Sequence, residues 1–321
     1  MAKVLGKHWS DFWQKYVPAR VPSKGLSPVH ISATYSLEIA SGGNLVKLNA
    51  LRWSGFDSRE NVKRGIVKDF SIESRQRLQR LLASINQDVA GLPTFLTLTY
   101  PFEYSLQWEV WKRDLDVFFR SFRRKWPRAW GVWRLEFQKR GAPHFHLLLW
   151  DGPIIEEPME VYSPKKKKMV WIGNPGNENN KELFQWFSST WYRVVGSGDG
   201  KHLKAGTRIE PIQSWNGVFY YTSKYLAKMT EGNFVPEGYA GRYWGIINKS
   251  LFPIDIRMLE ISEGAFLGIK RVLQERLEEK LKRKIELFPN EGITTFMDNE
   301  GAISLLESAL INSYENIDVP F

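Results

Sequence analysis

The stretch PHFHLLLW, residues 143–150, decides how the central part of the chain can fold. His144 and His146 flank Phe145, and four apolar residues follow. In a β-strand the side chains of residues i and i+2 point to the same face, so the two imidazoles project together while Phe145 projects into the core. Paired imidazoles are typical ligands of a transition metal, and the alternative is a pair of surface or hydrogen-bonded histidines. The pattern predicts a buried strand with a two-histidine metal site.

The preceding stretch GVWRLEFQ, residues 131–138, is predicted to be the neighbouring strand of a β-hairpin. If the connecting loop has an odd number of residues, even-numbered positions pair with even-numbered ones. Glu136 then faces the same side as the histidines and becomes a third ligand, which leaves coordination positions open for substrate or water. A loop of even length would place Glu136 on the other face. The alternative role for Glu136 is an ion pair with Arg134 or Lys139.

A second chemical feature is YYTSKYLAK, residues 220–228, in a predicted helix over 217–229. Tyr221 and Tyr225 are four residues apart, so they share one helix face. A free tyrosine has a pKa near 10 and is a poor nucleophile at neutral pH, but the adjacent ammonium groups of Lys224 and Lys228 would help it attack. The alternative is that both rings pack in the core while the lysines reach solvent.

The remaining periodicity predicts an α+β fold. We expect a central antiparallel sheet that carries the histidine pair, flanked by helices that include the tyrosine helix, with further helical regions at both ends. Residues 1–70 are irregular, with room for a strand or two broken at Gly42 and Gly43. We expect helices at 71–89, 105–126, 182–195 and 263–285, strands at 94–101 and 207–213, and loops around the four lysines 165–168 and at GSGDGKH, residues 196–202.

Composition limits the class of protein. The formal net charge of the chain is +10, and it is unevenly spread. No Lys or Arg follows Lys284 whereas seven acidic residues do, so residues 1–284 carry the +10 of the whole chain plus those seven charges, or +17. A basic body of this kind indicates a polyanion such as nucleic acid, the alternative being a solvated basic surface. There is no cysteine, no apolar segment of transmembrane length and no signal-peptide pattern, so we expect a cytoplasmic location.

With these residues in view, the chain resembles the HUH endonucleases, and among them the rolling-circle replication initiators of small plasmids and single-stranded DNA phages. FLTLTYP (95–101) resembles the Thr-rich first motif, RGAPHFHLLLW (140–150) the metal motif, and YTSKYLAK (221–228) the tyrosine motif. Glu136 resembles the acidic third ligand of some branches, and GRYWGI (241–246) a later Trp-Gly element. The tyrosines follow the histidines, as in replication initiators, whereas in conjugative relaxases they precede them.

The resemblance implies three regions: 1–90 of unknown role, either DNA-binding or packing on the nuclease; an endonuclease domain at 91–260; and a helical region with an acidic tail at 261–321. It implies that Mn²⁺ or Mg²⁺ is bound by His144, His146 and Glu136, with Mn²⁺ the better match to imidazole. It also implies attack on DNA by Tyr225 or Tyr221, with Tyr225 first because it directly follows Lys224. The products would be a 5′-phosphotyrosine and a free 3′-hydroxyl.

The expected substrate is origin DNA as a single strand or an extruded hairpin, with a helicase and a polymerase supplied by the host. The residues we expect to contact DNA are basic: Lys139, Arg140, Lys228, Lys201, Lys204 and Arg208. One alternative is a transposase-like strand transferase that uses the same site on different DNA ends. An alternative of another class is a non-catalytic, sequence-specific DNA-binding protein with a structural histidine pair.

Overall fold

A computed structural model describes residues 34–40, 42, 44–51, 70–165, 167–221, 235, 239, 241–285, 292–297, 300–301 and 304–305. Contacts divide the chain into two compact units. The larger unit is formed by residues 40–44 and 59–255, and the smaller by residues 1–39, 45–58 and 256–321. This division differs from the three consecutive regions 1–90, 91–260 and 261–321, because strands near the N-terminus pair with a strand near the C-terminus. The described part of the chain has no helix that is both long enough and apolar enough to cross a membrane.

The larger unit is built on a five-stranded sheet in the order β8-β3-β5-β4-β9, in which every neighbouring pair is antiparallel. The histidine strand β5 is therefore central, between β3 and β4. Alternation along these strands gives the sheet two distinct faces. The strands are β3 (Thr94–Thr99), β4 (Trp130–Phe137), β5 (Pro143–Trp150), β8 (Thr207–Pro211) and β9 (Trp244–Ile247).

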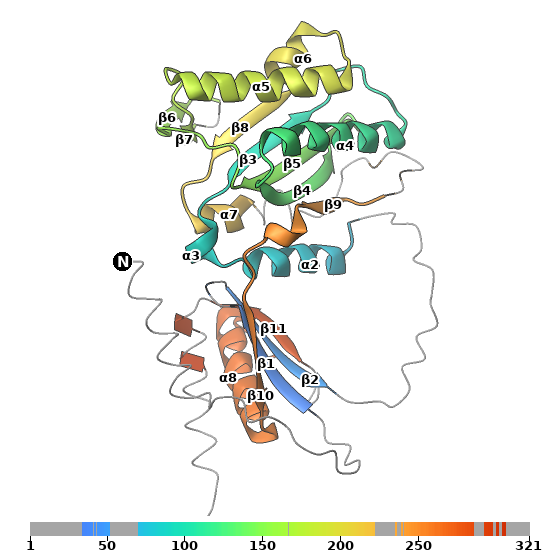
Figure 1. Ribbon diagram of the computed structural model, residues 1–321. Coiled ribbons are helices and arrows are strands. Elements are labelled where there is room, and N and C mark those ends of the chain that lie inside the picture. Colours follow the sequence, from blue (N-terminus) through green and yellow to red (C-terminus); the bar gives the residue numbers. More distant parts are fainter. Residues whose placement is uncertain are drawn as a thin grey trace, which may run out of the picture. The chain divides into compact units, whose positions relative to one another are not determined.

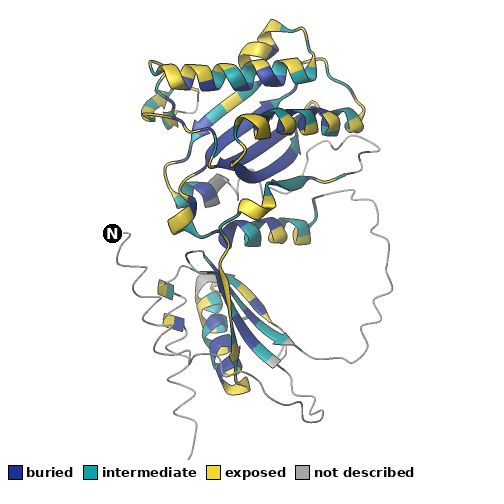
Figure 2. Cartoon of the chain, in the orientation of Figure 1, coloured by how far each residue is buried: buried dark blue, intermediate teal, exposed yellow. Residues whose placement is uncertain are grey.

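Helices cover both faces of this sheet (Figure 1). On one side lie α4 (Trp108–Lys125) and α5 (Glu178–Val195), and on the other α2 (Ile72–Ala83) and α7 (Trp215–Tyr221). The central strands are buried along their length (Figure 2). Phe145 is fully buried, and its ring lies 6.4 Å from that of Trp191 on α5, so it projects into the core as expected. The α+β class with a central antiparallel sheet is confirmed.

The amphipathic pattern explains α4 directly. Its apolar residues recur every three or four positions and form one buried stripe, while its last turn carries Arg123, Arg124 and Lys125, which suit the negative end of the helix dipole. The buried stripe consists of Trp111, Leu115, Phe118, Phe119 and Phe122.

Three local expectations were wrong. The region around the lysines is not simply a long loop, because β6 (Met159–Ser163) and β7 (Lys168–Ile172) pair as a two-stranded ribbon. Residues 196–202 are not a free loop either: Gly196 ends α5 in the left-handed conformation, and Asp199 caps α6 (Gly200–Ala205). The third was the N-terminal helical region, of which the described residues form strands instead. A short α3 (Gln87–Ala90) and a 3-10 turn, η2 (Lys249–Leu251), complete the larger unit.

The smaller unit has its own sheet and core. Its sheet has the order β10-β1-β2-β11, and α8 (Glu263–Leu281), the long charged helix expected near the C-terminus, belongs to the same unit. Leu37, Leu48, Phe266 and Leu305 are each fully buried in one apolar cluster. The four strands are β1 (Thr34–Ala40), β2 (Leu45–Leu51), β10 (Ile256–Ile261) and β11 (Ile293–Phe296).

Candidate metal and tyrosine site

The candidate metal ligands lie in neighbouring rows of the five-stranded sheet. Phe137 pairs with Pro143, so the hairpin loop has five residues, which is the odd length that the shared face requires. Glu136 therefore pairs with His144, and Arg134 pairs with His146. Directly paired side chains point to the same face of a sheet. The imidazole rings of the two histidines lie 4.6 Å apart, so the structure brings all three predicted ligands together.

Two threonines of β3 complete the rows and hold the imidazoles. Thr99 pairs with His144 and Thr97 with His146. The Thr99 hydroxyl lies 3.0 Å from Nδ1 of His144, and the Thr97 hydroxyl lies 3.2 Å from Nδ1 of His146. When each Nδ1–H donates to its threonine, the lone pair is on Nε2, the tautomer that a ligand at that nitrogen requires. The Thr-rich strand thus supplies matched supports for the histidine pair.

The environment of His144 keeps its ring neutral. Burial lowers the pKa of His144 to about 3, and the neighbouring His146 and Arg140 act in the same direction. A neutral imidazole is the form that can coordinate a metal ion. His146 is 3% exposed and its ring stacks on Phe95 at 5.5 Å, so both rings are fixed in place.

Glu136 makes two contacts, one for each role considered from the sequence. Its Oε2 lies 3.2 Å from Nε2 of His146, and its Oε1 lies 3.4 Å from Nη1 of Arg134. Arg134 is 1% exposed and its guanidinium lies 4.2 Å above the Phe70 ring. Burial lowers the pKa of Arg134 to about 10, so it stays protonated at neutral pH and can pair with the carboxylate. The ion-pair role of Glu136 is therefore present in the structure.

Within the described residues, no group of three or more His, Asp or Glu side chains is already arranged as a metal cage. The donor set nevertheless fits a divalent ion of the Mn²⁺ type, with two imidazoles and one carboxylate. Two ligands at adjacent corners of an octahedron with bonds of about 2.1 Å lie about 3 Å apart. The 3.2 Å between His146 and Glu136 is compatible with that spacing. Oε1 of Glu136 is buried without a hydrogen-bond partner in the described part, so a carboxylate oxygen is left for a cation.

The helix that leads to the tyrosines packs on the histidine face of the sheet. Trp150 has the same parity along β5 as the histidines and so points to their side. The ring of Trp215, the first residue of α7, stacks 6.2 Å from that of Trp150. The described part of α7 ends at Tyr221. The side chain of Tyr221, together with Lys224, Tyr225 and Lys228, lies outside the described residues.

With this geometry established, a comparison with protein families identifies the region. Residues 93–230 match the model of a family of replication-associated proteins, the ORF2 type. The match begins beside β3 and runs through the histidine pair and the tyrosine stretch. It supports a replication initiator of the Rep type. Searches of curated proteins and of solved structures gave no significant match.

The basic residues expected to contact DNA fall in different places on this Rep-like unit. Arg208 pairs with Thr97 in the sheet, so it lies on the histidine face, where Glu210 accepts a hydrogen bond from it at 2.6 Å. Lys139 is exposed in the hairpin turn beside His144. Lys201 and Lys204 are exposed on α6. Lys204 lines a groove of about 380 Å³ with Phe184, Gln185, Ser188, Thr207 and Ile209, and Ile209 points to the face opposite the histidines.

Arg140 has a structural role that the sequence did not indicate. Its guanidinium donates from Nη2 to the carbonyl of Tyr100 at 2.8 Å, from Nη1 to that of Phe102 at 2.9 Å, and from Nε to Oε1 of Gln138 at 3.0 Å. Three of the five N–H donors of this arginine therefore hold the hairpin turn against the chain that follows β3. Any contact of Arg140 with DNA uses the remaining two.

His202 is a further residue of the site region that sequence reasoning passed over, because it lies in a stretch expected to be a loop. It is 5% exposed, and its Nε2 donates to the Thr99 carbonyl at 2.8 Å while the Ser197 hydroxyl donates to its Nδ1 at 2.8 Å. The indole of Trp191 donates to the same carbonyl at 2.8 Å. Helices α5 and α6 thus fix the strand residue that supports His144.

Proposed function

We propose that this protein initiates rolling-circle replication by nicking single-stranded or hairpin origin DNA through tyrosine attack. The observation that carries the proposal is the pair of sheet rows that join Thr99, His144 and Glu136, and Thr97 and His146. These rows lie on the face that α7 covers, within the region that matches a replication-associated family. This arrangement corresponds to the metal and tyrosine motifs of the HUH endonucleases that the sequence resembles.

The ligands are assigned from this geometry. His144 and His146 would bind a divalent ion, Mn²⁺ or Mg²⁺, through Nε2, and Glu136 would bind it through a carboxylate oxygen. When bound, the ion neutralises charge that develops on a non-bridging oxygen of the scissile phosphate. The threonine hydroxyls hold each imidazole in the ligating tautomer. Arg134 orients Glu136 from its other side.

The covalent step belongs to the tyrosine. The phenolic oxygen of Tyr225, or of Tyr221, forms a bond to phosphorus, and the bond from phosphorus to the 3′-oxygen breaks. The tyrosine gives up its proton, with Lys224 positioned by sequence to stabilise the phenolate, and the leaving 3′-oxygen takes one up. The strand is left with a 5′-phosphotyrosine and a 3′-hydroxyl that a host polymerase can extend, while a host helicase opens the duplex. Attack by a later 3′-hydroxyl reverses the step without ATP.

Two other functions remain as outcomes of the test. A transposase-like strand transferase would perform the same chemistry on different DNA ends. A non-catalytic DNA-binding protein would use the histidines only structurally, and the contacts of Glu136 with Arg134 and His146 are those that such a role would need.

The deciding experiment uses single-stranded and hairpin oligonucleotides that are labelled at the 3′ end, because the fragment on that side of the cut becomes linked to the protein. With Mn²⁺ we expect a labelled band that survives denaturation and migrates with the protein. Chelation should abolish the band, and a double variant, His144→Ala with His146→Ala, should not form it although it still folds. Tight binding without any such band across the library would favour the non-catalytic protein.

A further inference from the structure

The chain that follows β3 presents large apolar side chains to solvent beside the candidate site. Phe102 is 83% exposed and Leu106 is 78% exposed, whereas the neighbouring Tyr100 is 3% exposed. A single exposed apolar residue on a surface is common and needs no explanation. The exposure of Phe102 is informative because of how firmly its loop is held and where the loop lies.

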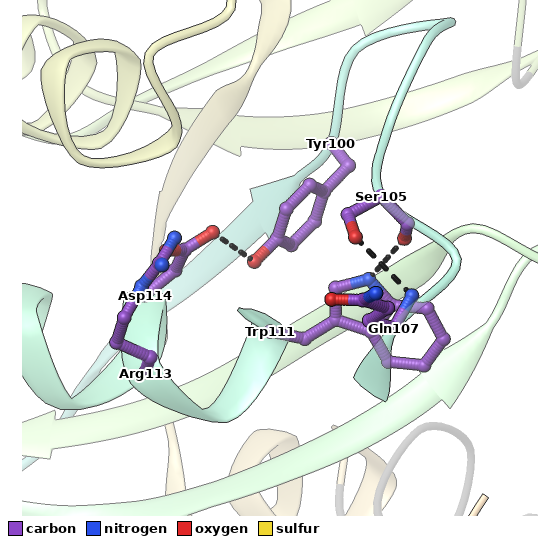
Figure 3. A network of polar contacts seen from close by, with 6 residues as sticks. All are labelled: Tyr100, Ser105, Gln107, Trp111, Arg113 and Asp114. Carbon is purple, nitrogen blue, oxygen red and sulfur yellow. Dashed lines mark hydrogen bonds and ion pairs between the residues drawn. The ribbon is translucent and has the colours of Figure 1, made fainter. Parts of the chain in front are cut away.

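The loop from Pro101 to Gln107 is anchored to α4 (Figure 3). The Tyr100 hydroxyl donates to Oδ2 of Asp114 at 3.0 Å, and Asp114 is 3% exposed and paired with Arg113. Further along, the indole of Trp111 donates to the Ser105 carbonyl at 2.6 Å. Burial and the carboxylate of Asp114 raise the pKa of Tyr100 well above its usual value, so this hydroxyl remains a donor at all physiological pH values.

The hairpin turn anchors the same loop from the other side. Arg140 donates to the carbonyls of Tyr100 and Phe102, and the Tyr104 hydroxyl donates back to the Arg140 carbonyl at 2.9 Å. The Arg140 guanidinium lies 5.2 Å from the Tyr104 ring and 6.0 Å from the Phe102 ring. Phe102 is therefore an exposed ring on a preorganised base, beside a cation.

The position of this ring relates it to the metal ligands. Phe102 follows Thr99, the partner of His144, by three residues, so the two Cα atoms are at most about 11 Å apart. Gln138 connects the features as well, since its Oε1 accepts from Arg140 while its Nε2 lies 3.4 Å from Nδ1 of His144. A nucleotide adjoining a phosphate at the histidine pair would be within reach of the Phe102 ring.

We propose that Phe102 is a stacking site for one unpaired nucleobase next to the scissile phosphate, with Arg140 beside it for the adjoining phosphate. The inference rests on the proposed function, because it takes single-stranded DNA as the ligand. An aromatic ring that is held rigidly loses little conformational entropy when a base stacks on it, and every base has a face to offer. The site would therefore hold the strand in position without reading its sequence.

The test measures binding without cleavage. Fluorescence anisotropy with a short single-stranded oligonucleotide in EDTA gives the affinity of the parent and of Phe102→Ala, Phe102→Trp and Leu106→Ala. Stacking on one aromatic residue contributes about 1–3 kcal/mol, which corresponds to a roughly 5- to 150-fold loss for Phe102→Ala. Phe102→Trp should bind as tightly as the parent or more tightly. Leu106→Ala is the matched control on the same loop and should stay within about twofold.

A set of oligonucleotides with one abasic position each identifies the stacked base. With the parent protein we expect a single position near the cut at which loss of the base weakens binding, and with Phe102→Ala we expect no further loss at that position. Equal affinities for Phe102→Ala and the parent, or equal losses for Phe102→Ala and Leu106→Ala, would overturn the stacking site. If no covalent adduct ever forms but Phe102→Ala still weakens binding, the nicking proposal fails and the stacking site stands.

Discussion

The support of His144 by Thr99 leads to the sharpest prediction about the candidate metal site. In Thr99→Val the side chain keeps its shape but loses the hydroxyl that lies 3.0 Å from Nδ1 of His144. Without this partner the ring has no fixed tautomer, and Gln138, whose Nε2 is 3.4 Å from the same nitrogen, is too distant to replace it well. Loss of such a support typically weakens metal binding about 10- to 100-fold, or about 1.4 to 2.7 kcal/mol.

The effect of Thr97→Val should be smaller. The ring of His146 also stacks on Phe95 and contacts Glu136, so it stays in place when the Thr97 hydroxyl is removed. We expect a loss near the lower end of the range, about tenfold or less.

Calorimetric titration with Mn²⁺ measures these affinities directly. The matched control is Thr94→Val, the same substitution in the same strand at similar burial, where the hydroxyl donates instead to the Pro153 carbonyl at 2.6 Å. This control should lose stability but keep its affinity for Mn²⁺. If Thr99→Val bound Mn²⁺ as tightly as Thr94→Val does, the assigned role of the threonine row would be refuted.

Three further predictions concern the nucleophile, a buried lysine and the DNA contacts. Tyr225→Phe should reduce the yield of covalent adduct more than Tyr221→Phe does in a denaturing gel, and a normal yield from Tyr225→Phe would reverse this ranking. Burial, with Arg242 nearby, lowers the pKa of Lys112 to about 7. The folded state therefore binds fewer protons than the unfolded state between pH 7 and about 10.5, and stability should rise with pH in that window by about 1 kcal/mol per unit. Denaturant unfolding should show that Lys112→Met lacks this rise, and an unchanged pH dependence would be inconsistent with the shift. Arg208→Gln and Lys139→Gln should each lower the slope of log affinity against log salt for single-stranded DNA by about 0.7, whereas Lys181→Gln, whose side chain pairs with Glu178, should not.

The central sheet was predictable because its strands carry short-range signals. Alternation in 143–150 and the position of Glu136 determined which side chains share a face, once the loop length was odd. The role of Thr97 and Thr99 could have been inferred from the same parity rule, because an antiparallel β3 places alternate threonines opposite the histidines. It was missed because the sequence does not state which strand lies beside β5.

Other parts depend on contacts between distant segments, which periodicity cannot report. The strands β1 and β2 pair with β10 and β11 from the other end of the chain, so no local pattern defines the smaller unit. Arg140 was read as a free cation because its acceptors are backbone carbonyls of residues 100 and 102, which leave no mark in the sequence. His202 was overlooked for the same reason, since its partner is the Thr99 carbonyl.

The most direct test of the central claim is to identify the residue that becomes joined to DNA. The protein is incubated with Mn²⁺ and a cleavable hairpin oligonucleotide, digested with protease and nuclease, and analysed by tandem mass spectrometry. We predict a nucleotide linked through its 5′-phosphate to a peptide containing residues 221–228, with the modification on Tyr225 or Tyr221. A nucleotide on a tyrosine outside this stretch, or cleaved DNA with no protein-linked nucleotide, would contradict the account.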